Sequence, residues 1–179
     1  MTTRNELLEE ILAATSSGSS KGGFIDYNDT ATSITPITLP ADTWTTITND
    51  GLGVFSNDTY RPDGVTELYD VSTDQVDFSE LALGDTVFIR NDFVVTPNSN
   101  NTLLQFRYKL GVGGFDYTLE KSLGRLDSGS GIPYRFALNV DKIYMGDLNT
   151  RDNPGVIQVK LSATGELVNA GSVLTVIKR

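Results

Sequence analysis

The beginning of the chain carries the apolar pattern of a short amphipathic helix, which we expect from Arg4 to about Ala14. Thr3 and Glu6 have the spacing of a capping box, in which side chains satisfy the free backbone donors at a helix start. Glu9 and Glu10 fall outside the apolar stripe and give the helix a polar face. The stripe itself consists of Leu7, Leu8, Ile11 and Leu12.

A serine- and glycine-rich stretch follows this predicted helix and behaves as a flexible coil. A helix of about eleven residues is marginal alone in water, and such a linker does not press it onto its own domain. We therefore expect the stripe to bind a partner surface, in a groove rather than by self-association, since it is broader than a coiled-coil seam. The chain divides into an N-terminal anchoring helix (residues 1–15), a Ser/Gly-rich linker (16–23) and a folded domain (24–179).

Period-two alternation dominates the folded domain and is clearest at residues 104–110, where apolar and polar side chains alternate without a break. This pattern is typical of a half-buried antiparallel strand. Residues 86–96 carry a second long strand pattern, interrupted on its apolar face by Asn91. The turn-forming residues 97–101 join the two strands, so the sequence predicts a long β-hairpin.

Shorter alternating runs occur along the whole domain, with irregular segments at 50–63, 111–117 and 121–133. These runs are 24–27, 37–39, 44–48, 66–69, 75–78, 134–141, 157–161 and 172–178. About eight to ten short strands at this spacing predict an all-β fold, an antiparallel jelly-roll-like β-sandwich. An α/β fold is the alternative, but it needs crossover helices between the strands, and no run has their length or period.

Composition and charge exclude several functions. The chain has neither cysteine nor histidine, so a Ser-His-Asp triad, a thiol nucleophile and a histidine- or thiolate-bound metal are impossible. The net charge is −9, and residues 57–85 carry eight acids against the single base Arg61, the opposite of a nucleic-acid-binding surface. No apolar run approaches the roughly 18 residues of a membrane span. We expect no direct nucleic-acid contact, no membrane partner and no cofactor.

Several local patterns suggest a site, and each has a simpler structural interpretation. The acids of 57–85 match no calcium loop and are better explained as solvated loop ends. In the calcium-like segment 147–153, Arg151 stands where a cation needs a ligand, so we expect a turn. Gly111, Gly113 and Gly114 precede strand-like residues and not a helix, which favours a tight connection over a phosphate-binding loop. The loop 127–131 is either mobile or ordered by a neighbouring subunit.

Two further candidate sites are a sugar-binding platform of aromatic residues and a pair of catalytic carboxylates. Trp44, Tyr60, Tyr69 and Tyr117 can form a sugar-stacking platform, but we favour packing of Trp44 in the core. Arg107 and Lys109 are interpreted as the polar face of a sheet. Paired carboxylates for glycoside hydrolysis have no supporting spacing, so we do not expect an enzyme.

Several strings in the domain resemble jelly-roll structural proteins of tailed bacteriophages. They are residues 26–29, 36–39, 42–51, 64–70, 78–85, 113–115 and 143–150, and the resemblance covers most of residues 24–155. It implies a capsid decoration, head-fibre or tail-fibre protein, commonly a homotrimer whose sandwiches pack about a threefold axis. It implies no catalytic residues.

The resemblance and the helix pattern together suggest a virion structural protein on the outer surface of a phage particle. In this hypothesis, a capsid decoration or head-fibre homotrimer attaches to the major capsid protein or to neighbouring virion proteins through Leu7, Leu8, Ile11 and Leu12. The alternative is a tail-fibre or receptor-binding module that recognises host surface glycans.

Overall fold

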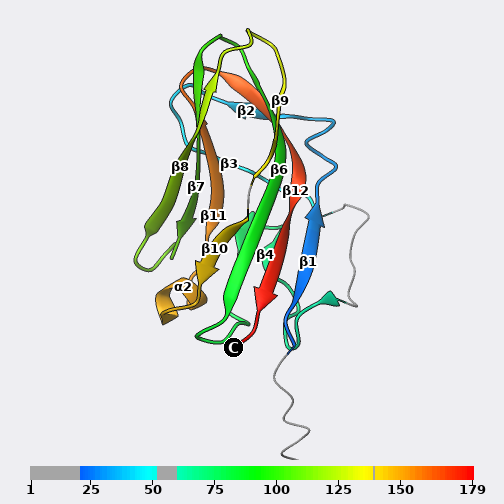
Figure 1. Cartoon of the computed structure of the whole chain (residues 1–179), viewed down its shortest axis with the longest axis vertical. Helices are drawn as coiled ribbons and strands as arrows, with labels where there is room; N and C mark the ends of the chain where they lie inside the picture. Colours follow the sequence, from blue (N-terminus) through cyan, green and yellow to red (C-terminus); the bar gives the residue numbers. More distant parts are fainter. Residues whose placement is uncertain (1–20, 52–59, 139) are drawn as a thin grey trace, which may run out of the picture.

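The computed structural model describes residues 21–51, 60–138 and 140–179, in which two antiparallel β-sheets pack face to face (Figure 1). The larger sheet has six strands in the order β1, β12, β6, β10, with β2 beside β12 and β9 beside β6. Their bounds are β1 (Gly23–Asn28), β2 (Ile37–Leu39), β6 (Thr86–Pro97), β9 (Tyr134–Ala137), β10 (Asp141–Tyr144) and β12 (Gly165–Ile177).

The smaller sheet has four strands in the order β3, β11, β7, β8. Their bounds are β3 (Thr45–Thr46), β7 (Thr102–Leu110), β8 (Tyr117–Leu126) and β11 (Val156–Leu161). The remaining elements are the paired strands β4 (Tyr69–Asp70) and β5 (Gln75–Val76) and the short helix α2 (Leu148–Asp152). Among the described residues, no helix has both the length and the apolar character needed to cross a membrane.

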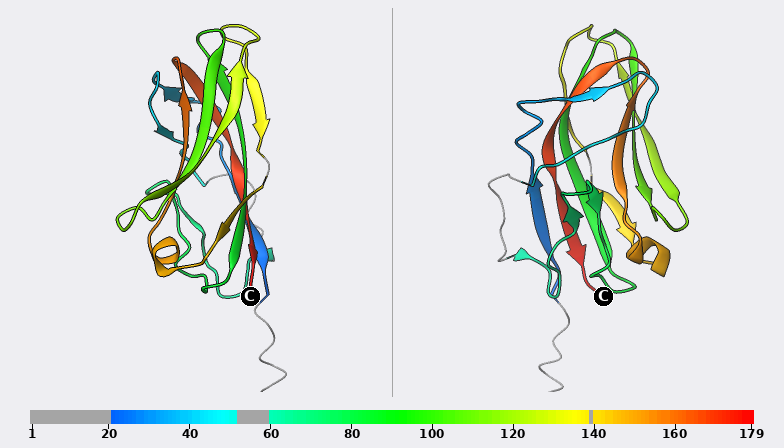
Figure 2. Two further views of the ribbon diagram at one scale, coloured as in Figure 1. Left: turned by 60° about the vertical axis from the view of Figure 1, so that its left-hand side comes forward. Right: turned by 180° about the vertical axis from the view of Figure 1, so that it is seen from behind.

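The strand pairs are nested, with the first strands of the domain paired to the last. β1 and β2 pair with β12, β3 with β11, β6 with β9 and β10, and β7 with β8, all antiparallel. Contacts of β12 with β6 and of β11 with β7 complete the two sheets. Nested pairs rolled into two layers are the jelly-roll arrangement, so the predicted all-β jelly-roll-like sandwich is confirmed (Figure 2).

The predicted hairpin over residues 86–110 is wrong. β6 and β7 are consecutive, but β6 belongs to the larger sheet and β7 to the smaller one, so the turn between them crosses from layer to layer. Their apolar faces meet in the core, where the rings of Phe93 and Phe106 stack with centroids 6.2 Å apart. Alternation shows that one face of each strand is buried, but it does not distinguish pairing side by side from packing face to face.

Residues 121–126, which the sequence predicts to be irregular, belong to β8. β8 is an edge strand, exposed along most of its length, and its register shifts opposite Leu104 and Gln105. Exposure on both faces and a bulge together remove the alternation by which a strand is identified.

Strand boundaries near the C-terminus also differ from the predicted ones. β12 begins at Gly165, inside the predicted turn and well before Ser172, the predicted start of the strand. A bulge at Asn169 and Gly171 interrupts its pairing with β6. Gly171 has a φ of +115°, and a Cβ atom there would lie 2.2 Å from the carbonyl oxygen of Tyr27, so only glycine fits. Conversely, the predicted strand 134–141 divides into β9 and β10, which pair with different parts of β6.

A polar pair explains the interruption of the apolar face of β6. Asn91 is buried, and its Nδ2 donates a hydrogen bond of 2.6 Å to the hydroxyl oxygen of Tyr108 on the facing sheet. Because each side chain satisfies the other, the core accommodates both polar groups.

The two described ends of the chain lie together at one end of the sandwich. Gly23 pairs with Val176 in the register of β1 and β12. The C-terminal residues contact the buried carboxylate of Asp85, which accepts a hydrogen bond from the backbone of Arg179 at 3.0 Å and lies 3.4 Å from Lys178 Nζ. Figure 1 shows the C-terminus at the lower end, beside the start of β1.

Candidate functional site

The predicted attachment residues Leu7, Leu8, Ile11 and Leu12 lie outside the residues that the structure describes. The described residues begin at Lys21, within the predicted Ser/Gly-rich linker. Lys21 exchanges two backbone contacts with Asp63: its N–H donates to Oδ2 at 2.7 Å, and its carbonyl accepts from the Asp63 N–H at 2.9 Å.

The two glycines after Lys21 are closely packed. A Cβ atom on Gly22 would lie 2.5 Å from the carbonyl oxygen of Val176, and one on Gly23 would lie 2.1 Å from that of Tyr60. β1 begins at Gly23, the last residue of the predicted linker. Residues 21–23, at the end of the predicted linker, are therefore packed between β12 and the loop that carries Asp63.

Trp44 lies on the outer surface of the smaller sheet, where a cationic cluster surrounds it. The Arg107 guanidinium carbon is 4.1 Å from the centroid of the Trp44 ring, and Lys160 Nζ is 4.7 Å from it. Arg107 Nε donates to Gln158 Oε1 at 2.9 Å, and Gln158 Nε2 donates to Thr46 Oγ1 at 3.3 Å. We call Trp44, Thr46, Arg107, Gln158 and Lys160 the Trp44 cluster.

The predicted core position of Trp44 is wrong. The ring is only half-buried, and Arg107 and Lys160 occupy the polar, outward-facing positions of β7 and β11. This confirms the prediction that Arg107 and Lys109 lie on a polar sheet face. Burial lowers the pKa of Arg107, although the nearby Glu120 opposes this shift. The cluster therefore holds two cations next to an aromatic ring, a combination that suits an anionic or polar ligand.

The other three aromatic residues of the predicted platform do not join Trp44. Tyr60 stacks on Phe24 with centroids 5.3 Å apart, Tyr69 is buried, and the Tyr117 hydroxyl lies 2.9 Å from Thr150 Oγ1. The sequence identified one aromatic member of the cluster but not its cationic neighbours. Alternation places Arg107 and Lys160 on polar faces, and only the pairing of β3, β11 and β7 brings those faces together.

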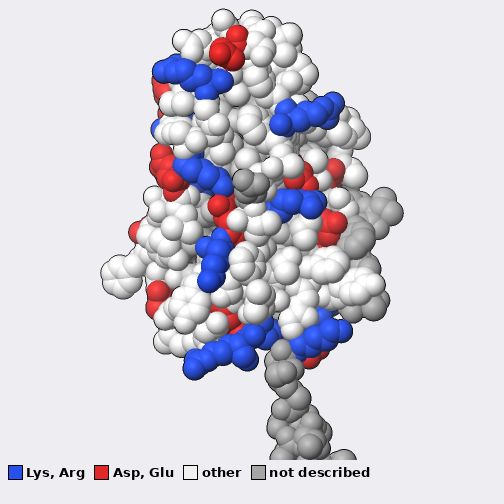
Figure 3. Space-filling model, viewed as in Figure 1, with Lys and Arg blue, Asp and Glu red and all other residues white. Residues whose placement is uncertain are grey.

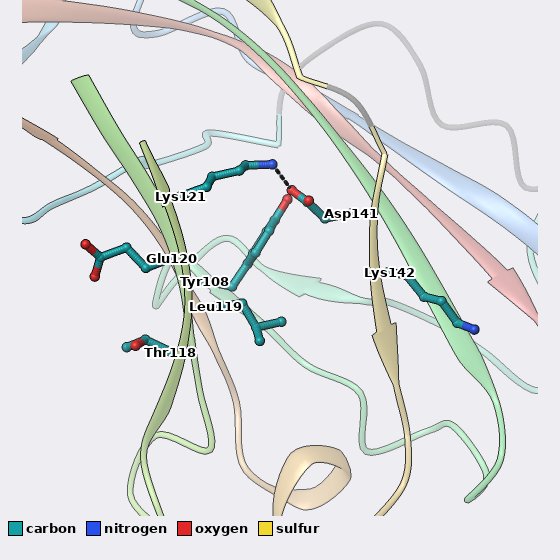
Figure 4. Close-up of a pocket in the computed structure, with 7 residues that line it drawn as sticks. All are labelled: Tyr108, Thr118, Leu119, Glu120, Lys121, Asp141 and Lys142. Carbon is teal, nitrogen blue, oxygen red and sulfur yellow. Dashed lines mark hydrogen bonds and ion pairs between the residues drawn. The ribbon is translucent and has the colours of Figure 1, made fainter. Parts of the chain in front are cut away.

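A groove of about 450 Å³ opens between the edge strands β8 and β10 (Figure 4). Its lining is Tyr108, Thr118, Leu119, Glu120, Lys121, Asp141 and Lys142. Lys121 and Asp141 form an ion pair across the two sheets, and Lys121 Nζ lies 5.2 Å from the centroid of the Phe106 ring. Burial raises the pKa of Tyr108, and the charge and hydrogen bond of Asp141 raise it further. Tyr108 therefore remains protonated, and its hydroxyl oxygen accepts the hydrogen bond from Asn91 beside the groove.

The acids between residues 60 and 85 mainly stabilise turns. Asp70 accepts hydrogen bonds from Ser72 and Thr73, Asp77 accepts one from the Ser79 backbone, and Glu80 accepts backbone hydrogen bonds from Thr66 and Glu67. These hydrogen bonds lower the pKa of Asp70 and, against the opposing effect of burial, that of Glu80. Among the described residues, no group of three or more acids has the arrangement of a metal site.

The calcium-like segment forms a short helix rather than the predicted turn. Asp147 caps the helix α2 by accepting the Thr150 N–H at 2.8 Å, and Arg151 contacts Asp152 at 2.6 Å. Asn149 then binds the β7–β8 loop in both directions: its Oδ1 accepts the Phe115 N–H and its Nδ2 donates to the Phe115 carbonyl, each at 2.9 Å. Gly111 and Gly113 have positive φ in this loop, which confirms the predicted tight connection.

The loop 127–131 makes its contacts within its own chain. Ser130 Oγ donates to the Asn98 carbonyl and the Gly131 N–H to the Pro97 carbonyl, both at 2.7 Å. The loop is thus bound to the connection between β6 and β7 by contacts within the chain.

Comparisons with known proteins place the chain beside two virus structures and identify no family. No family model matches the chain, and no curated protein does. Among solved structures, that of infectious bursal disease virus Gx strain matches with a TM-score of 0.44, 12% identity and coverage of 90% of this chain. That of the Gt strain matches with a TM-score of 0.41, 12% identity and coverage of 89%. The chain spans 32% and 34% of those two chains, about a third of their length.

Proposed function

We propose that this chain is a virion structural protein, a capsid decoration or head-fibre homotrimer of the phage type. Its jelly-roll sandwich forms the outer body, and Leu7, Leu8, Ile11 and Leu12 attach it to the major capsid protein or to neighbouring virion proteins. The main support is the nested jelly-roll topology, an arrangement used by viral shell proteins, in a chain whose sequence strings resemble phage structural proteins.

The place where the predicted anchor joins the domain supports attachment at one end. Lys21 and Gly23 are held at the end of the sandwich where β12 finishes, whereas the connections 98–101 and 127–133 lie at the other end (Figure 1). An anchor that leaves from one end directs the opposite loops away from the shell. In a trimer, binding of one anchor raises the effective concentration of the other two at the shell, so individually weak helices still hold the protein on the particle.

The test is a deletion of residues 1–20. Lys21 stays because its backbone bonds Asp63, and Gly23 stays because it belongs to β1. We expect the shortened protein to fold and to lose co-sedimentation with phage heads that lack the protein. Leu8→Asp in the full chain removes binding in the same way, and Glu9→Gln, outside the stripe, is the matched control. Unchanged head binding by the shortened protein would overturn the proposal.

A second candidate function, recognition of host surface glycans, is favoured by the Trp44 cluster. An indole ring beside a guanidinium, an ammonium and an amide offers both a stacking surface and hydrogen-bond donors for an acidic sugar. Trp44→Ala and Lys160→Met are expected to abolish binding to host cells or to acidic oligosaccharides, and Arg125→Met is the control on the same sheet. Equal binding by all variants contradicts this function.

A further inference from the structure

The outer face of the six-stranded sheet combines apolar side chains with an incompletely satisfied charge centre. Thr86 on β6 pairs with Ile177 on one side and Tyr144 on the other, and the next outward position along β6 is Phe88. Ile177 and Tyr144 are 55% and 56% exposed. The sheet lies in front in Figure 1, so Figure 3 shows this face, with uncharged surface between separated charged groups.

The charge centre lies on the same face, at Asp26, Arg90 and Asp92. Arg90 directs both of its contacts to one oxygen of Asp92, with Nε at 3.1 Å and the terminal nitrogen at 2.9 Å from Oδ2. The other oxygen, Oδ1, is buried and has no hydrogen-bond partner among the described residues. A buried carboxylate oxygen without a donor carries its full desolvation penalty, so Arg90 compensates the charge of Asp92 only in part.

Asp26 adds a second carboxylate to this centre. Burial raises the pKa of Asp26, Arg90 lowers it, and the charge of Asp92 raises it. Val173 of β12 pairs with Asp26 on one side and with Arg90 on the other, so Asp26 lies on the same face as the Arg90–Asp92 ion pair. Close to β1 and β6 the face therefore carries two carboxylates and one guanidinium, and a further cation there would balance their charge.

Cations of this kind are present at the opposite edge of the same face. Arg135 on β9 pairs with Val94, and Lys142 on β10 pairs with Phe88, so both side chains face outward. Both residues are exposed, and among the described residues neither forms an ion pair. The face is thus polarised, with surplus carboxylate toward β1 and surplus cation toward β9 and β10.

A polarised face is complementary to itself when copies are related by rotation. The cationic edge of one copy then meets the acidic side of the next, and about the threefold axis of the proposed homotrimer this heterologous contact closes into a ring. The apolar residues Phe88, Tyr144 and Ile177 lie between the two charged regions and become buried in such a ring.

We propose that copies of this chain associate through the outer face of the six-stranded sheet, with Lys142 and Arg135 of one copy meeting Asp26 and Asp92 of the next. This inference rests on the proposed homotrimer and assigns its contact surface. The outer face of the smaller sheet is a poorer candidate, since its strands carry the cations Arg107, Lys109, Arg125 and Lys160 with the acid Glu120, so two such faces would bring like charges together. Two of these cations already contact Trp44.

The experiment measures the molar mass of the full chain by light scattering over a range of concentrations, with circular dichroism to verify folding. Lys142→Glu and, separately, Asp26→Lys are each expected to weaken association about tenfold or more, because each places like charges together. The double variant Asp26→Lys, Lys142→Glu restores part of the loss, as expected for charges that couple between copies. Arg125→Glu, the same charge reversal on the smaller sheet, leaves association unchanged.

A second pair of variants tests the apolar part of the face. Tyr144→Ser is expected to weaken association, and Phe115→Ser, an exposed aromatic outside this face, is the control. A wild-type chain that is monomeric throughout, or an assembly weakened only by Arg125→Glu or Phe115→Ser, overturns the inference.

Head binding separates this inference from the proposed function. If Lys142→Glu assembles like the wild type and the protein still binds heads, only the contact surface is wrong. If assembly depends on this face but the full chain does not bind heads, the proposed function fails and the contact surface stands.

Discussion

Three buried tyrosines illustrate how single residues adjust to the core. Tyr27 donates to Glu67 Oε1 at 2.6 Å and accepts the Leu68 N–H at 2.8 Å, and Tyr69 donates to Asp74 Oδ1 at 3.2 Å. Burial raises the pKa of Tyr27, Tyr69 and Tyr108, and a neighbouring carboxylate raises each further. The phenols therefore stay protonated as long as the fold is intact.

This gives a prediction for alkaline pH. The folded pKa of each of the three exceeds the ordinary value near 10, so above about pH 10 the unfolded chain releases protons that the folded chain retains. Stability is expected to be unaffected by these groups below that pH and to fall above it. Ultraviolet titration should show only part of the seven tyrosines ionising before circular dichroism reports unfolding. Ionisation of all seven in the folded protein would contradict the assignment.

Two phenylalanines test the packing between the sheets. Phe106 is fully buried against Phe93, whereas Phe115 is 86% exposed. We expect Phe106→Ala to lower the free energy of unfolding by about 3–5 kcal/mol, through lost burial and a residual cavity. Phe115→Ala, the identical substitution at a surface loop, should change it by less than about 0.5 kcal/mol. Denaturant unfolding measures both, and similar losses at the two positions would refute the assigned core.

At the scale of elements, the short helix α2 fixes the β7–β8 loop, a connection that the sequence pattern predicts to be irregular. Asn149 of α2 bonds both backbone groups of Phe115, and a Cβ atom on Gly114 would lie 2.5 Å from Asn149 Oδ1. The β7–β8 loop is therefore ordered by a helix that follows it by more than thirty residues in the chain.

Removing this contact should have a local effect. Asn149→Ala leaves the Phe115 backbone to water, and we expect faster amide exchange and proteolysis at residues 111–116 with a global loss of about 1 kcal/mol. Asp152→Ala, at an exposed position on the same helix, is the control. A large global loss with no local change would contradict this role.

The elements also show which strands the sequence pattern predicts and which it does not. The long strands β6 and β7 and the apolar side of β11 follow from alternation, because one face of each is buried. The pattern predicts β8 only in part, since an exposed, bulged edge strand has no buried face to produce alternation. The polar residues that flank Trp44 in the sequence favour a core position, whereas the cations that contact its ring, Arg107 and Lys160, come from distant parts of the chain.

At the scale of the whole molecule, the domain holds both of its described ends by its own contacts. Asp85 fixes the last two residues, and Asp63 fixes Lys21. We expect the chain without residues 1–20 to unfold at the same denaturant concentration as the full chain, at a protein concentration that keeps assembly equal. A clear shift of the midpoint would show that the removed segment belongs to the folded domain.

The sequence by itself determined the all-β class and the exclusion of histidine- and cysteine-based chemistry. These properties depend on composition and on periods of a few residues, which are local. Only the tertiary structure decided that β6 and β7 lie in different layers, that Trp44 joins Arg107 and Lys160, and that Asp26, Arg90 and Asp92 gather on one face. Each of these depends on pairing between strands distant in sequence, and alternation fixes the faces of a strand but not its neighbours.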